Sequence, residues 1–298
     1  MKIAMFSDTY FPQTNGVVNS IYNFSKELSE RGHEVHIFAP SGSSHKGSVE
    51  NGITVHEIDS FPFPLYSKNY QVANIIPSME VLETFKENDF DIIHSHTMFS
   101  MGIQAYMMAK IFDKPLLGSF HTLISKFTEY VTEKRKEDLS KLGWLYCRMY
   151  YNKFCDCTAV PTNSTKKIAK EKGFKNKIYV LPNGVKLEER KERKPELIRE
   201  KYNIPKERDL ILYLGRISVE KRIQDLINAM EYLEDDKTLL ICGKGPYREE
   251  LEELAEGSEN RIIFAGYIQE KLKGDYYSAA DVFAFPSIGD TQGIVLLE

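Results

Sequence analysis

Residues 1–185 alternate short apolar runs with segments of helical periodicity. Between the first two runs, Val17, Ile21, Phe24 and Leu28 recur at i, i+4, i+7 and i+11, which places them on one face of an amphipathic helix. Strands that are joined to helices by short connections pair in parallel, so the pattern predicts an α/β fold. The expected strands are residues 2–6, 34–39, 53–58, 91–94, 115–120, 158–161 and 177–181, and further helices are expected over about 77–88, 99–112 and 164–172.

The pattern changes between residues 186 and 208, where charged residues follow one another without apolar periodicity. Pro195 and Pro205 interrupt this stretch, so we expect 186–208 to be an inter-domain linker. A second α/β pattern then begins. Its expected strands are residues 210–214, 238–242, 262–265 and 282–285, and its expected helices start at about 223 and cover 247–255 and 271–280.

The predicted architecture is therefore α/β with two doubly wound, Rossmann-like domains, an N-terminal one over 1–185 and a C-terminal one over 209–298. Domains of this kind bind ligands at the carboxyl ends of their strands. We expect the two domains to face one another across a cleft that holds the site.

Composition excludes several classes of protein. The chain has 298 residues, of which 42% are hydrophobic and 28% charged, and these values exclude wholesale disorder. No stretch approaches the ~20 uninterrupted apolar residues that a membrane-spanning helix needs. The four cysteines are too few and too unevenly spaced for a disulfide framework, so we expect reduced thiols and a cytoplasmic location.

The formal net charge of −4 conceals an asymmetry. Residues 1–185 carry 21 basic and 19 acidic side chains, whereas residues 186–298 carry 18 and 24. Within the first half, residues 139–154 combine the single tryptophan and several other aromatic side chains with Lys141 and Arg148. This combination is typical of a helix at a membrane interface, and it is equally compatible with a core helix. One expectation is thus peripheral association with the anionic inner face of a membrane.

Two cations follow the first predicted strand of the second domain. Arg216 and Lys221 lie five residues apart, just after residues 210–214. A planar guanidinium and a compact ammonium together suit a diphosphate, although both could also be solvated. The functional interpretation is favoured because the dipole of the following helix would repel a purely structural cation at its N-terminus.

Two carboxylates lie eight residues apart near residue 298. Asp290 and Glu298 flank Gly293, and a helix beginning near Gly293 would place Glu298 about one turn further on. Carboxylates bind sugar hydroxyls by accepting charge-assisted hydrogen bonds.

The glycines after the strands do not form a nicotinamide-binding motif. Neither Gly16, after the first strand, nor Gly243 belongs to a G-x-G-x-x-G pattern.

Taken in chain order, these motifs resemble the retaining GT-B glycosyltransferases of family 4. Asp290 and Glu298 match the two acidic residues of the family's E-x₇-E motif, with Asp290 in place of the first glutamate. Asp290-Thr291-Gln292-Gly293 is similar to the branch that glucosylates diacylglycerol and related lipids. The other motifs that carry the resemblance are residues 8–16, His94-Ser95-His96, Phe120-His121-Thr122, Pro182-Asn183-Gly184-Val185, residues 215–221 and Gly243-Lys244-Gly245-Pro246.

The resemblance implies a hexosyltransferase that acts with retention of configuration. It favours glucose as the hexose, UDP-glucose as the NDP-sugar donor and a lipid such as diacylglycerol as the acceptor. The four expected catalytic residues are Arg216 and Lys221 at the diphosphate, Asp290 at the transferred sugar and His121 beside the reacting carbon. The other expected donor-binding residues are Gly16 near the phosphates, Gly243, Ile268, Gly293, Ile294 and, at the ribose, Glu298.

The chain departs from the family pattern in two places. Lys186 replaces the usual aspartate after Asn-Gly-Val, and the sequence stops at Glu298, where the family continues. We therefore expect the second domain to be incomplete at its C-terminus. We expect neither a cofactor nor a nucleic-acid partner. No metal ion is expected either, since His94 and His96 lie two residues apart at a strand end and diverge from helical ligand geometry.

Other functions remain open from the sequence. A family-4 transferase could act on a polysaccharide or on a small soluble acceptor instead of a lipid. An NDP-sugar epimerase has a similar two-domain architecture, but the spacing of Asp290 and Glu298 argues against it. A non-catalytic NDP-sugar-binding relic is the third alternative.

Overall fold

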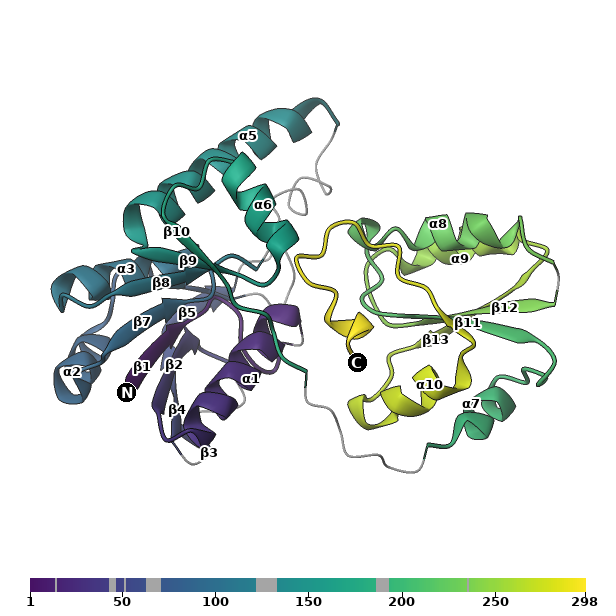
Figure 1. Cartoon of the computed structure of the whole chain (residues 1–298), viewed down its shortest axis with the longest axis horizontal. Coiled ribbons are helices and arrows are strands. Elements are labelled where there is room, and N and C mark those ends of the chain that lie inside the picture. The colour runs from purple at the N-terminus through teal and green to yellow at the C-terminus, as the bar shows by residue number, and fades with distance from the viewer. Residues whose placement is uncertain are drawn as a thin grey trace. The chain divides into compact units, whose positions relative to one another are not determined.

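Buried apolar strands organise the chain into two α/β units (Figure 1). The first unit ends at Gly184 and the second begins at Val185. The computed structural model describes residues 1–13, 15–42, 47–50, 52–62, 71–121, 133–185, 193–234 and 236–298.

The first unit is built on an eight-stranded sheet with the order β10-β9-β8-β7-β1-β2-β4-β3. All neighbouring strands are parallel except β3, which runs antiparallel to β4. Strands β5 and β6 form a separate antiparallel pair. The strands are β1 (Lys2–Phe6), β2 (Glu34–Pro40), β3 (Gly47–Glu50), β4 (Ile53–Ile58), β5 (Ser60–Pro62), β6 (Gln71–Ala73), β7 (Ile92–Ser95), β8 (Leu116–Ser119), β9 (Cys157–Val160) and β10 (Lys177–Val180).

Helices cover both faces of this sheet, because successive side chains of a strand point to opposite sides. In β1, Ile3 and Met5 pack with α1, whereas Ala4 and Phe6 pack into the larger core with the other helices. The helices are α1 (Gly16–Glu30), α2 (Met79–Asn88), α3 (Ser100–Ile111), α5 (Glu133–Met149), which continues as the π-helical turn η1 (Tyr150–Phe154), and α6 (Asn163–Glu171).

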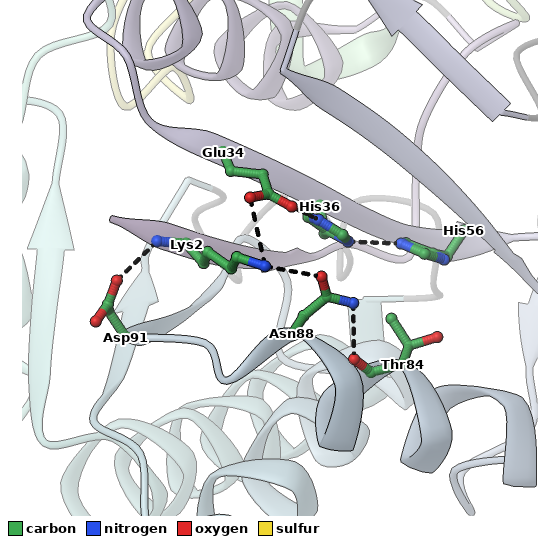
Figure 2. A network of polar contacts seen from close by, with 7 residues as sticks. All are labelled: Lys2, Glu34, His36, His56, Thr84, Asn88 and Asp91. Atoms are coloured by element: carbon green, nitrogen blue, oxygen red, sulfur yellow. Dashed lines mark hydrogen bonds and ion pairs between the residues drawn. The ribbon is translucent and has the colours of Figure 1, made fainter.

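A polar network closes the amino-terminal side of the sheet (Figure 2). His36 Nδ1 lies 2.8 Å from His56 Nε2, and His36 Nε2 lies 2.9 Å from Glu34 Oε1. Lys2 Nζ contacts Glu34 at 3.5 Å and donates to Asn88 Oδ1 at 3.2 Å. Burial and the neighbouring His36 lower the pKa of His56 to about 4, so this histidine is neutral at pH 7.

The second unit contains a parallel four-stranded sheet with the order β13-β12-β11-β14. Helices α8 and α9 cover one face and α7 and α10 the other (Figure 1). Its elements are α7 (Pro195–Lys201), β11 (Asp209–Leu214), the 3₁₀ turn η2 (Val219–Lys221), α8 (Ile223–Met230), β12 (Lys237–Cys242), α9 (Arg248–Glu256), β13 (Arg261–Gly266), the 3₁₀ turn η3 (Glu270–Leu272), α10 (Lys273–Ala279), β14 (Val282–Phe283) and the 3₁₀ turn η4 (Ile294–Leu296).

The predicted fold class, two doubly wound α/β domains, is confirmed in each unit. Two local expectations differ from the structure. Helix α7 lies inside the stretch 186–208 that was expected to be a linker, and its buried Ile198 packs against the core of the second unit. The expected helix near Gly293 is only the short turn η4, which Gly293 precedes with the non-helical backbone angles φ −76° and ψ 81°.

Candidate active site

The loops that follow β11 and β12 pack tightly against one another. Gly243 has φ +152°, and a Cβ there would lie 1.8 Å from the carbonyl oxygen of Gly215. A Cβ on Gly245 would lie 1.8 Å from the carbonyl oxygen of Ile217, whose N–H donates to the Lys244 carbonyl at 3.0 Å. Close backbone approach therefore explains both glycines. The expected donor contact of Gly243 stays a prediction.

Arg216 lies on the first of these loops, at the carboxyl end of β11. Its side chain is exposed, and its carbonyl accepts a 2.8 Å hydrogen bond from the Tyr213 hydroxyl. Burial raises the pKa of Tyr213, so this hydroxyl stays protonated and holds the loop. The fixed backbone thus presents a solvated guanidinium at the edge of the sheet where Rossmann-like domains bind ligands.

Lys221 and Asp290 form an ion pair, which joins two of the four expected catalytic residues. Lys221 Nζ donates to Asp290 Oδ1 at 2.8 Å and to Oδ2 at 2.7 Å. The side chains are 14% and 18% exposed, and Nζ also lies 5.3 Å from the centre of the Phe285 ring. The pair forms because β14, which precedes Asp290 in the chain, lies beside β11, which precedes Lys221.

The remaining donor-site candidates of the second unit lie in different surroundings. Glu298 contacts α10: its carboxylate accepts from Lys273 Nζ at 3.1 and 3.2 Å and from the Tyr277 hydroxyl at 2.9 Å. Gly293 and Ile294 form the start of η4. The side chain of Ile268 is buried in the core, so it could meet a donor only through its backbone.

In the first unit, Gly16 begins helix α1 directly after the cap residue Asn15. The Asn15 side chain accepts from the N–H groups of Val17 and Val18, each at 3.0 Å. A Cβ on Gly16 would meet no described atom within 4 Å, so packing does not require the glycine. Open space at a glycine is compatible with the expected approach of a phosphate to the backbone.

His121 follows β8 and belongs to a group of three histidines, of which His94 and His96 are buried and His121 is half-buried. Its Nε2 lies 3.1 Å from His96 Nδ1, with the two rings stacked, and His94 Nε2 lies 2.7 Å from Ser119 Oγ. Burial lowers the pKa of His121 to about 4 and that of His94 to about 3, and it also lowers the pKa of His96. All three rings are therefore neutral at pH 7.

The hydrogen bond between His96 and His121 was not predicted. It follows from the parallel pairing of β7 with β8, which places the residues after the two strands side by side. His96 Nε2 has no hydrogen-bond partner among the described residues, although it is buried. Across the described ranges, the structure contains no cluster of three or more His, Cys, Asp or Glu residues that could hold a metal ion.

Asn183 is a further residue whose contacts sequence reasoning missed. It is buried, and its Oδ1 accepts from Ser20 Oγ of helix α1 at 2.5 Å. One residue later, the Gly184 carbonyl accepts from Asn23 Nδ2 at 3.0 Å. The segment after β10 is thus fastened to the same helix that begins at Gly16.

Comparison with protein families assigns both halves of the chain. The model of glycosyltransferase family 4 matches residues 14–189, and the model of glycosyl transferases group 1 matches residues 194–298. The chain belongs to glycosyltransferase family 4. This membership confirms two predictions: the protein is a GT-B glycosyltransferase, and it is a hexosyltransferase.

Two curated relatives share one name. An alpha-monoglucosyldiacylglycerol synthase of Streptococcus pneumoniae is 31% identical over all of this chain and 68% of its own length. The enzyme of that name from Acholeplasma laidlawii is 27% identical over all of this chain and 77% of its own length.

A solved structure shows the same fold. Anabaena Alr3699/HepE in complex with UDP-glucose superposes with a TM-score of 0.71, at 17% identity, over 96% of this chain and 73% of that one. At this identity the likeness concerns the fold alone. No helix within the described ranges has the length and apolar character to cross a membrane.

Proposed function

We propose that this hexosyltransferase moves glucose from UDP-glucose to a hydroxyl group of a diacylglycerol-type lipid, with retention of configuration. The observation that carries the proposal is the Lys221–Asp290 ion pair beside Arg216, at the carboxyl end of β11. The names of the two curated relatives support transfer of glucose to a lipid acceptor.

The second unit would bind the donor. In the reaction the acceptor oxygen bonds to the anomeric carbon, the bond from that carbon to the diphosphate oxygen breaks, and UDP leaves. The acceptor's proton passes to the leaving diphosphate. Arg216 and Lys221 stabilise the charge that develops on UDP, and Asp290 accepts hydrogen bonds from sugar hydroxyls.

The first unit would bind the acceptor and supply His121 near the reacting carbon. A ring with a pKa of about 4 is neutral at pH 7, so it can donate one N–H without adding positive charge near the oxocarbenium-like carbon. His96 restricts the orientation of this ring, because its Nδ1 and the His121 Nε2 share one hydrogen bond.

A labelled-donor assay tests the proposal. UDP-glucose carrying a radiolabelled glucose is incubated with dispersed diacylglycerol, and the label is followed into the organic phase, where we expect it. Label that enters a polysaccharide or a soluble glycoside instead would favour the alternative acceptors, and conversion of the free NDP-sugar to its epimer would favour an epimerase. Proton NMR of the lipid product then distinguishes the α-anomer, expected for retention, from the β-anomer.

The donor is tested separately by thermal shift. A ligand that binds only the native protein raises the melting midpoint, by an amount that grows with its concentration relative to Kd. We expect UDP-glucose to raise the midpoint more than GDP- or ADP-glucose does. A larger shift with another nucleotide would refute the uridine assignment and leave the lipid acceptor untouched.

A further inference from the structure

Helix α5 exposes a second apolar face in addition to the one that it buries. Cys147 and the following Tyr150 pack into the core, but Leu139, Leu142 and Leu145 are 40%, 62% and 53% exposed, and Met149 is 43% exposed. Because a helix has 3.6 residues per turn, these four side chains form one stripe along the outside. The helix therefore contributes to the core and also exposes an apolar face to solvent.

Basic side chains are frequent on α5 and on the neighbouring elements. Helix α6 lies next to α5 (Figure 1): Lys172 Nζ is 5.2 Å from the centre of the Trp144 ring, and Arg148 packs under Gly173. The exposed basic residues of this region are Lys141, Arg148, Lys153, Lys167, Lys170, Lys172, Lys175 and Lys177. We call the apolar stripe and these cations the α5–α6 face.

The positive charge of the first unit is concentrated in the segment that contains this face. Residues 139–177 contain nine basic and two acidic side chains, whereas residues 1–138 contain 12 and 17. No described carboxylate pairs with Lys167, Lys170 or Lys175 in an ion pair. Uncompensated cations on the helix next to an exposed apolar stripe fit an anionic, apolar partner, which is the chemistry of a bilayer that contains anionic lipids.

A second exposed apolar patch in the same unit lacks this charge. Ile75, Ile76 and Met79, before and at the start of α2, are also exposed. Residues 75–88 contain three glutamates and a single lysine, so an anionic surface would repel them. Charge complementarity therefore selects the α5–α6 face between the two patches.

We propose that the α5–α6 face is the surface by which the first unit docks on an anionic lipid bilayer. The inference rests on the proposed lipid acceptor, since docking would hold the enzyme where such an acceptor lies. The leucine stripe would enter the boundary between headgroups and acyl chains, and the lysines would contact lipid phosphates.

Two double variants test the two components of the face. Leu142→Gln with Leu145→Gln removes the apolar stripe while keeping a good helix former at each position. Lys167→Gln with Lys170→Gln removes two exposed cations of α6. The matched controls are Ile75→Gln with Met79→Gln for the other apolar patch, and Lys86→Gln with Lys110→Gln for two exposed lysines on α2 and α3.

Co-sedimentation is measured with phosphatidylcholine vesicles that either contain or lack phosphatidylglycerol. We expect binding to the anionic vesicles only, and weaker binding at about 1 M salt than at about 0.1 M, because the Debye length falls from about 10 to about 3 Å. The leucine variant should lose about tenfold in affinity. The α6 lysine variant should lose about 25-fold, at about fivefold for each cation, and both controls should stay within about twofold of the parent.

Several results would overturn the docking surface: no binding, equal binding to neutral and anionic vesicles, or losses in the controls and not in the α5–α6 variants. Transfer to a water-soluble short-chain diacylglycerol separates this outcome from the proposed function. If the protein glucosylates diacylglycerol and the α5–α6 variants bind vesicles as well as the parent does, the docking surface alone is refuted. Vesicle binding through this face, without transfer to any diacylglycerol, refutes the proposed acceptor alone.

Discussion

Replacement of Lys221 by glutamine should weaken both the stability of the second unit and its binding of UDP. The change removes two hydrogen bonds, of 2.8 and 2.7 Å, from an Asp290 side chain that is only 18% exposed. Exposed ion pairs contribute at most about 1 kcal/mol, and breaking a fully buried pair costs about 3–5 kcal/mol. For this partly buried pair we expect a loss of about 1–3 kcal/mol in the free energy of unfolding, or about 4–12 °C in Tm for a domain of this size.

The effect of Lys221→Gln on UDP binding is separate from its effect on stability. A charge-assisted hydrogen bond to a phosphate is worth about 1.5–3 kcal/mol, which corresponds to a loss of about 10–100-fold in UDP affinity. The loss in kcat/KM should be about 10²–10³-fold, because the contact strengthens as charge develops on the leaving diphosphate. UDP lacks the transferred sugar, so its binding reports on the diphosphate contact without the expected contact of Asp290.

A double-mutant cycle of Lys221→Gln with Asp290→Asn distinguishes the role of Lys221 in stability from its proposed role in UDP binding. Calorimetric titration with UDP and thermal unfolding are measured for both single variants and the double variant. Asp290→Asn alone should bind UDP at least as tightly as the parent, since the lysine is no longer neutralised by a carboxylate. The double variant should recover most of the Tm while UDP binding stays weak.

Recovery of parental UDP affinity in the double variant would refute the diphosphate contact, because Lys221 would then act only by neutralising Asp290. Arg199→Gln is the matched control. Arg199 is the equally buried cation of another ion pair in the same unit, with Asp281 at 2.7 Å. Its loss should lower Tm and leave the Kd for UDP unchanged.

Three further predictions follow from other groups. Arg216→Ala should lower kcat/KM by about 10²–10³-fold with little change in Tm, because the side chain is exposed; activity within threefold of the parent would contradict its role. With Arg216 and Lys221 in their proposed role as the cations at the diphosphate, EDTA should leave transfer unchanged; loss of activity in EDTA that Mn²⁺ or Mg²⁺ restores would be the contrary result. Folding lowers the pKa of His56 from 6.5 to about 4. Between these two pH values the unfolded state binds a proton that the folded state does not, so the stability contribution of His56 is complete above pH 6.5 and is lost as the pH falls towards 4. The slope of Tm against pH between 6.5 and 4 should therefore be shallower in His56→Asn, and an unchanged slope would contradict the assignment.

Strands with strongly apolar sequences were predictable because their pattern is local. The predicted residues 2–6 and 53–58 coincide with β1 and β4, whose sequences read as continuous or alternating apolar runs. Strands β5 and β6 were missed, since each has only three residues and is stabilised by pairing with the other. Helix α7 was missed because the charged sequence around Pro195 hides a single buried side chain, Ile198.

The members of the candidate site were predictable as separate motifs, but their contacts were not. Lys221 and Asp290 are 69 residues apart, and they meet because β11 and β14 are neighbours in the sheet. His96 and His121 meet because β7 pairs with β8. Strand order is a property of the whole sheet, and residue spacing along the chain does not contain it. The contacts of Glu298 with Lys273 and Tyr277 were likewise not predictable, and its expected contact with the ribose stays a prediction.

The ion pair changes how charge is distributed at the proposed donor site. Lys221 is already neutralised by Asp290, so it adds little net charge to attract a diphosphate, whereas Arg216 is exposed and solvated. Long-range attraction of the donor would thus depend mainly on Arg216. Lys221 would gain a second anionic partner only when the diphosphate reaches it, and that contact would strengthen as the bond to the sugar breaks. Arg216 would thus contribute chiefly to binding of the donor, and Lys221 chiefly to stabilisation of the leaving group.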